Sequence, residues 1–246
     1  MLELEHISFD VPGEQGQKEI IRDISLSIPD RAFVAITGPN GGGKSTLAKL
    51  IAGIEKPTAG RILLDGEDIT QMSITDRANR GISYAFQQPV RFKGIQVLDL
   101  LRIAAGKDRP LSITDACAYL SEVGLCAKDY VNREVNASLS GGELKRIEIA
   151  TVLARGQKLS VFDEPEAGID LWSFQNLIQV FRKLHDGIHG SSIIIISHQE
   201  RIMEIADEIV VLSNGKVLTQ GTREEVLPKL LGGTDTCHFC PREEGV

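Results

Sequence analysis

The sequence predicts an α/β fold in which a core of mostly parallel strands carries an N-terminal antiparallel β subdomain and an inserted α-helical subdomain. Three observations support this prediction. Short runs of wholly or mostly apolar residues, typical of strands buried on both faces, occur at 32–36, 159–162 and 193–196. Residues 2–9 alternate between apolar and polar, as in a half-buried antiparallel strand. From 89 to about 135 the apolar residues follow a helical period instead.

The first part of the chain should form the β subdomain and the first unit of the core. A second strand is expected at 24–28. The glycine-rich loop after the first buried strand should lead into a helix at 46–52. Residues 61–64 are followed by Asp65-Gly66, which is typical of a β-hairpin turn.

The middle of the chain should form the inserted helices, because Val97, Leu100, Leu101 and Ala104 recur at helical spacing. We therefore predict one domain of 246 residues. Its nucleotide-binding core and β subdomain would comprise 1–88 and 156–246, and its helical subdomain 89–155.

The last part returns to the core. A helix at 174–184 separates the two later buried strands. A strand at 209–212 meets an Asn214-Gly215 turn, and a final helix is expected to be capped by Thr222, with Glu225 three residues on.

Composition narrows the function classes. The chain is 42% hydrophobic and 25% charged, as in a globular protein, and its net charge of −7 with no basic stripe argues against a nucleic-acid partner. Four cysteines in a chain of this size favour a reducing, cytoplasmic setting. Neither a signal peptide nor a run long enough to span a bilayer is evident, so another protein would have to provide any membrane span.

A phosphate-binding motif follows the first buried strand. It fits G-x-x-x-x-G-K-[ST], and the helix begins immediately afterwards. Backbone N–H groups of such a loop surround the β-phosphate of a nucleotide, the lysine reaches the β and γ oxygens, and the serine hydroxyl binds Mg²⁺. The motif and the residue after it are Gly38, Pro39, Asn40, Gly41, Gly42, Gly43, Lys44, Ser45 and Thr46. The sequence therefore predicts a P-loop NTPase core that binds ATP and Mg²⁺.

Two carboxylates, Asp163 and Glu164, close the next buried strand. In a P-loop hydrolase the first holds Mg²⁺ and the second polarises the attacking water. We predict these roles here, with Glu164 as the catalytic base. The alternative for Glu164 is a structural carboxylate at a strand end.

The segment Leu139-Ser140-Gly141-Gly142-Glu143 lies ahead of this acidic pair and opens a helical pattern. With the motifs on either side, it resembles the signature of the ATP-binding cassette (ABC) ATPases. Ser140, Gly141 and Gly142 would form an anion site at a helix N-terminus. The resemblance implies a split site, in which one subunit supplies the phosphate loop and its partner supplies the signature, so the chain should pair with a second copy or a related ATPase.

The same resemblance assigns further residues. Gln87 matches the Q-loop glutamine, which contacts Mg²⁺ and the attacking water, although Gln88 beside it is the alternative. His198 matches the switch histidine that contacts the γ-phosphate, and Asp170 the D-loop that crosses to the facing subunit. One departure is Val11, which stands where the family places an aromatic residue on the adenine, so base selectivity stays open.

Within the ABC family, the run from Ala85 to Ile95 resembles the SufC-type ATPases of iron–sulfur cluster assembly. That resemblance implies a SufB- or SufD-like scaffold as partner. The alternative is the ATP-binding subunit of a membrane transporter, which Asp163-Glu164-Pro165 fits well, with a permease as partner and a peripheral position at the membrane. DNA-repair or translation roles and a non-enzymatic module are disfavoured, because coiled-coil insertions and a second cassette are lacking and Glu164 and His198 are both in place.

A Cys237-His238-Phe239-Cys240 segment near the C-terminus allows two interpretations. Such a pair can bind zinc or iron or pass on sulfur, but it usually needs ligands from elsewhere. Cys117 and Cys126 belong to the predicted helical region, and nothing in the sequence brings them near. The alternative is an incidental tail.

Overall fold

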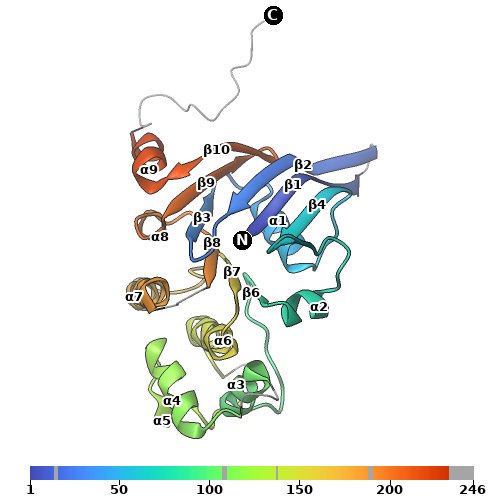
Figure 1. Ribbon diagram of the computed structural model, residues 1–246. Helices are drawn as coiled ribbons and strands as arrows, with labels where there is room; N and C mark the ends of the chain where they lie inside the picture. Colours follow the sequence, from blue (N-terminus) through green and yellow to red (C-terminus); the bar gives the residue numbers. More distant parts are fainter. Residues whose placement is uncertain (14–15, 107–109, 137, 188–190, 233–246) are drawn as a thin grey trace, which may run out of the picture.

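The structure is a computed structural model that describes residues 1–13, 16–106, 110–136, 138–187 and 191–232. Its fold is α/β, as predicted (Figure 1). The strands are β1 (Leu2–Gly13), β2 (Gly16–Ile28), β3 (Phe33–Thr37), β4 (Ala59–Leu64), β5 (Glu67–Asp68), β6 (Ile82–Ala85), β7 (Leu159–Asp163), β8 (Ser192–Ile196), β9 (Glu208–Ser213) and β10 (Lys216–Thr222). The helices are α1 (Lys44–Ala52), α2 (Ile74–Asn79), α3 (Val97–Ala105), α4 (Ile113–Glu122), α5 (Ala127–Tyr130), α6 (Gly141–Arg155), α7 (Leu171–Gly187), α8 (Glu200–Met203) and α9 (Arg223–Leu231).

The described residues form two sheets. The antiparallel sheet has the strand order β2-β1-β4-β5, and the larger sheet has the order β10-β9-β3-β8-β7-β6. Neighbouring strands from β9 to β6 run parallel, whereas β10 pairs antiparallel with β9 at the edge. The carboxyl ends of β3, β8, β7 and β6 therefore lie along one edge, where α/β proteins bind ligands.

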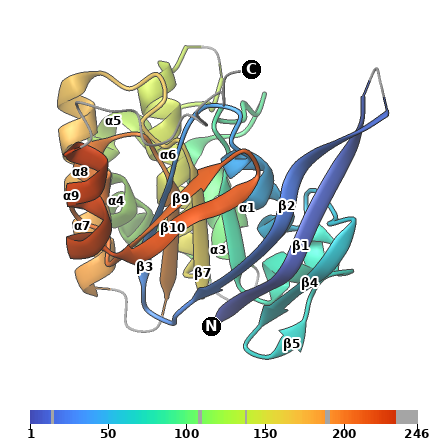
Figure 2. The same cartoon turned by 90° about the horizontal axis from the view of Figure 1, so that it is seen from above.

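The larger sheet is covered on both faces, which explains its continuous apolar strands. Phe33 and Ala35 of β3 belong to the same buried cluster as Phe181 of α7. Their neighbours Val34 and Ile36 point the other way and belong to a cluster with α1 and the antiparallel sheet. Figure 2 shows α1 between the two sheets, with α7, α8 and α9 on the opposite side of the larger sheet.

The helices α3 to α6 gather at the β6 end of the larger sheet (Figure 1). Leu101 of α3, Leu120 of α4 and Ile147 of α6 are fully buried in one cluster with the core of the larger sheet. The proposed limits of this subdomain, 89–155, stay a prediction.

Several elements differ from the sequence-based expectation. The first hairpin is longer, because β1 continues to Gly13 and β2 begins at Gly16. Its far end is largely exposed, so backbone pairing extends there without an apolar pattern to reveal it. The short elements β6, α2 and α8 were not predicted. Within the described part of the chain, no helix combines the length and apolar character needed to cross a membrane.

Candidate active site

Four of the predicted site segments meet at the carboxyl edge of the larger sheet. The glycine-rich loop beginning at Gly38 follows β3, and Gln87 follows β6 after Phe86. Glu164 directly follows β7, and His198 follows β8 after Ser197. Because these strands are neighbours, residues far apart in sequence reach one site.

The glycine-rich loop has the backbone shape that its composition suggests. Gly38 has a φ of 134°, and a Cβ there would lie 1.9 Å from the carbonyl oxygen of Leu212. Only glycine fits so close to a neighbouring strand. Lys44 is only 5% exposed. Its Nζ donates to the carbonyl oxygens of Gly38 (2.8 Å) and Pro39 (3.0 Å). Burial lowers the pKa of Lys44, although Glu164 and Asp163 oppose that shift.

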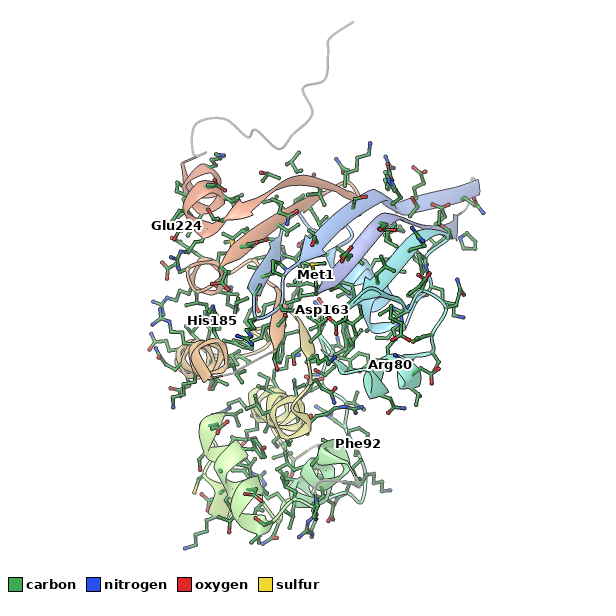
Figure 3. All side chains as sticks on the ribbon, viewed as in Figure 1. Met1, Arg80, Phe92, Asp163, His185 and Glu224 are labelled. Atoms are coloured by element: carbon green, nitrogen blue, oxygen red, sulfur yellow. The ribbon has the colours of Figure 1, made fainter. Side chains whose placement is uncertain are left out.

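The oxygen atoms expected to hold a metal ion are already close together. Ser45 Oγ donates to Asp163 Oδ1 over 2.9 Å, and the hydroxyl of Tyr84 donates to Asp163 Oδ2 over 2.8 Å. Asp163, labelled in Figure 3, is 2% exposed and lies at the centre of the molecule. Hydroxyl and carboxylate oxygens are the ligands that Mg²⁺ takes, so these residues fit that ion. Burial is the main cause that raises the pKa of the Tyr84 hydroxyl, and the nearby Asp163 carboxylate raises it further.

The three residues predicted to be catalytic lie in contact. Gln87 Nε2 donates to Glu164 Oε2, and His198 Nε2 lies 3.5 Å from Glu164 Oε1. Glu164 has a φ of 43°, a conformation that glutamate rarely adopts and that aims its side chain between these partners. The structure thus brings Gln87, rather than Gln88, to the acid. Their catalytic roles stay a prediction.

The signature residues do not join this site within one chain. Ser140 caps α6: its Oγ accepts from the backbone N–H of Glu143 (3.2 Å), and the Glu143 carboxylate accepts from the N–H of Ser140 (2.6 Å). Ser140, Gly141 and Gly142 belong to the part of the chain that the structure describes. None of them lines the nucleotide-sized cavity at the glycine-rich loop. That cavity has a volume of about 750 Å³ and is lined by Lys18, Glu19, Ile20, Arg22, Asn40, Gly41, Gly42, Gly43, Lys44, Ser45, Thr46, Gln87, Glu164, Asn214 and Gly215. Asp170, at the start of α7, accepts from the backbone N–H of Ser173 over 3.0 Å.

A family model for the ABC transporter matches residues 21–167, more than half of the chain. The chain belongs to the ABC transporter family. The uncharacterized ABC transporter ATP-binding protein MJ0035 of Methanocaldococcus jannaschii is 39% identical over 218 residues, covering 86% of each chain. The sulfate/thiosulfate import ATP-binding protein CysA of Synechocystis sp. is 36% identical, covering 95% of this chain but only 66% of CysA. A dimeric structure of the ATP-binding cassette MJ0796, in a post-hydrolysis state with ADP and Pi, has the same fold (TM-score 0.82, 22% identity, 91% of this chain and 99% of that one covered).

Membership of the ABC family confirms the prediction of an ABC ATPase. Neither relative is named as a SufC-type ATPase, and the similarity to CysA, which is named as an import subunit, extends over 95% of this chain. These findings favour the transporter alternative over the iron–sulfur assembly interpretation, which relied on one loop.

The predicted departure at Val11 concerns the part of the cavity away from the phosphate loop. The cavity lining there consists of Lys18, Glu19, Ile20 and Arg22, and no described aromatic residue contributes to it. Phe9 packs against the core next to the antiparallel sheet. Base selectivity therefore stays an open prediction.

Some contributors to the site carried no clear sequence signal. Tyr84 supports Asp163 from β6, a strand that was not predicted. Glu166 accepts a hydrogen bond from Ser197 Oγ, and burial raises its pKa. The only hint was a third acid in the run from Asp163 to Glu166.

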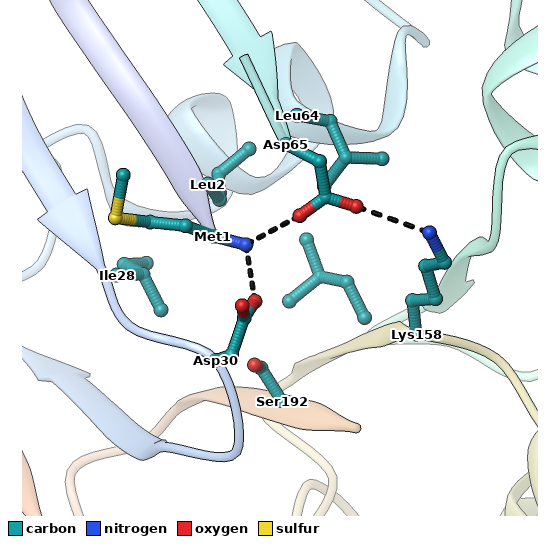
Figure 4. Close-up of a pocket in the computed structure, with 9 residues that line it drawn as sticks. Met1, Leu2, Ile28, Asp30, Leu64, Asp65, Lys158 and Ser192 are labelled. Atoms are coloured by element: carbon teal, nitrogen blue, oxygen red, sulfur yellow. Dashed lines mark hydrogen bonds and ion pairs between the residues drawn. The ribbon is translucent and has the colours of Figure 1, made fainter. Parts of the chain in front are cut away.

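Two further features lie away from this site. A cavity of about 220 Å³ lies at the amino-terminal ends of β7 and β8, where the Met1 amine contacts Asp30 and Asp65 and Lys158 pairs with Asp65 (Figure 4). It is at the opposite end of the strands from Lys44. Cys237 and Cys240 lie outside the described residues, and within the described residues no group of three or more His, Cys, Asp or Glu side chains could hold a metal ion.

Proposed function

We propose that this chain is the ATP-binding subunit of an ABC transporter and that it hydrolyses ATP at a site completed by a second ATP-binding subunit. The observation that carries the proposal is the contact of Gln87 and His198 with Glu164, next to the buried ammonium of Lys44. A P-loop with only a binding role would need neither the acid nor its two polar partners.

Each residue then has a task in hydrolysis. Lys44 would exchange its carbonyl partners for the β and γ oxygens of ATP. Glu164 would accept the proton of the attacking water, while Gln87 and His198 hold that carboxylate and the water in line. Ser45 and Asp163 would hold Mg²⁺, which supplies charge neutralisation at the phosphates when bound.

A second subunit is needed because the signature lies outside the cavity of its own chain. Ser140 and the free N–H groups at the start of α6 form an anion site that suits a γ-phosphate. A facing cassette would bring this site to the nucleotide. The partner cassette is either a second copy or a related chain.

An apolar groove next to Gln87 suits a membrane-embedded partner. Phe86, Val90, Phe92 and Ile103 are 39%, 48%, 36% and 66% exposed, respectively, and they line a cavity of about 210 Å³ with residues of α3 and α6. Phe92 is labelled beside these helices in Figure 3. Exposed apolar side chains in one groove mark an interaction site. We propose that a permease subunit inserts an apolar segment here, so that the ATPase works at the cytoplasmic face of the membrane.

The experiment is purification of the tagged chain from its native cells, from detergent extracts of membranes and from detergent-free lysate in parallel. Co-purification with a polytopic membrane protein, lost in a Phe92→Asp variant and kept in an Ile113→Asp variant on the exposed side of α4, supports the proposal. Recovery of a stoichiometric soluble scaffold from the detergent-free lysate would support the SufB/SufD interpretation instead.

A further inference from the structure

A buried ion pair on α6 lies directly behind the loop that carries Gln87. Lys145 is completely buried, the Glu148 side chain is 15% exposed, and Lys145 Nζ lies 3.1 Å from Glu148 Oε2. A lysine without contact to water is costly unless acceptors surround its ammonium. Besides Glu148, the acceptors here come from a different part of the chain.

The pair contacts the backbone around Phe86 from both sides. Lys145 Nζ donates to the carbonyl oxygen of Phe86 and lies 3.4 Å from that of Gln87. Glu148 Oε1 accepts from the backbone N–H of Phe86 over 2.9 Å. Burial raises the pKa of Glu148, and Lys145 and the Phe86 N–H oppose this shift. The donor and acceptor of one residue are thus both held by a single turn of α6.

These contacts take the place of the hydrogen bonds between β6 and β7, which end at Ala85. Strand β6 stops there, so the peptide groups of Phe86 and Gln87 have no neighbouring strand to bond. The Phe86 side chain is 39% exposed and packs edge-on against Tyr84, with 4.9 Å between the ring centroids, whereas that of Gln87 is exposed, so packing alone does not fix the Gln87 backbone. The orientation of Gln87, whose amide donates to Glu164, consequently depends on α6.

We propose that Lys145 and Glu148 are positioning residues for hydrolysis: they fix the Phe86–Gln87 backbone and thereby hold the Gln87 amide on Glu164. The same helix begins at Ser140, so the signature and the catalytic acid are joined by a short chain of polar contacts. This inference rests on the function proposed above, because it requires Glu164 to be the hydrolytic base.

A double-mutant cycle tests the proposal. Lys145→Met should lower kcat for MgATP about tenfold to hundredfold, with KM changed by less than about twofold, because a misplaced group affects the transition state more than substrate binding. In a Gln87→Ala background the same substitution should change kcat by less than about twofold. Lys158→Met, which removes a lysine whose side chain is 66% exposed, is the matched control and should retain native kcat.

Two results overturn the inference. One is native hydrolysis by Lys145→Met, and the other is an equal loss of kcat in the native and Gln87→Ala backgrounds, which indicates a merely structural role. If Lys145→Met is unfolded at the assay temperature, Glu148→Gln, which keeps the side-chain shape, takes its place in the cycle. Native hydrolysis by Glu164→Gln would remove the proposed function itself, whereas an inactive Glu164→Gln beside a fully active Lys145→Met would remove only this inference.

Discussion

Replacement of Arg77 by methionine should unfold this protein more readily than almost any other single arginine substitution. Arg77 is completely buried, and it donates to the carbonyl oxygens of Leu50 (2.6 Å), Ile51 (2.9 Å) and Thr70 (2.8 Å). The first two lie in the last turn of α1, whose carbonyl groups have no partner within the helix. The guanidinium therefore completes the helix that starts at Lys44.

The expected loss follows from these contacts. Methionine fills much of the volume but leaves the carbonyl oxygens of Ile51 and Thr70 without a donor, whereas that of Leu50 keeps the N–H of Gly53 (3.2 Å). Each buried acceptor without a donor costs about 1–3 kcal/mol unless water replaces the lost group. Part of this loss of stability is offset in the variant, because burial of the guanidinium is itself unfavourable. Burial also lowers the Arg77 pKa to about 10. We expect the free energy of unfolding to fall by about 3–5 kcal/mol.

Urea unfolding followed by circular dichroism measures this difference. Arg102→Met is the control, because Arg102 is half exposed and its i,i+3 pair with Asp99 spans 3.8 Å; it should cost less than about 0.5 kcal/mol. A loss below about 1 kcal/mol for Arg77→Met would refute the reasoning that the α1 carbonyls depend on Arg77.

Three further outcomes are expected. Gly38→Ala should abolish detectable nucleotide binding in calorimetry, because its Cβ would collide with the Leu212 carbonyl; native affinity would contradict this. Lys44→Ala should weaken ATP binding by about tenfold or more, measured with a fluorescent analogue, whereas Lys49→Ala on the same helix should not. Burial raises the folded-state pKa of Glu166 above its ordinary 4.5, so its contribution to stability is present below that pH and is lost as pH rises through the raised value. Glu166→Gln should therefore gain stability relative to the native protein as pH rises above about 4.5, and a pH-independent difference would contradict the assignment.

The parts of the fold that the sequence predicted are those with a strong local pattern. Continuous apolar runs such as 193–196 fit strands covered on both faces, and the glycines of the phosphate loop require backbone shapes that few residues adopt. The β6 strand escaped prediction because Ser83 and Tyr84 break its apolar character. Tertiary contacts explain these two polar side chains, because Ser83 hydrogen-bonds to Ser160 and Tyr84 to Asp163.

The motifs predicted which residues meet at the edge of the sheet, but not which residues support them. The motifs bring Lys44, Glu164 and His198 to one edge through strand order, which follows from parallel β-strands. Lys145 could not be predicted, since a lysine on a helix normally faces solvent and its partners lie far away in sequence. The SufC interpretation relied on the loop from Ala85 to Ile95, and loops vary more between relatives than the elements they connect. The comparisons cover most of the chain and favour a transporter subunit.

The central claim, a site divided between two subunits, is tested most directly by mixing two inactive variants. Ser140→Arg disables the signature, and Lys44→Ala disables the phosphate loop. If the site is split, each variant alone should be inactive. A mixture should recover roughly a quarter of the native ATPase rate, because half of randomly formed dimers contain one intact composite site. ATP hydrolysis at the native rate by Ser140→Arg alone would contradict the account, because the signature would then play no part in the reaction.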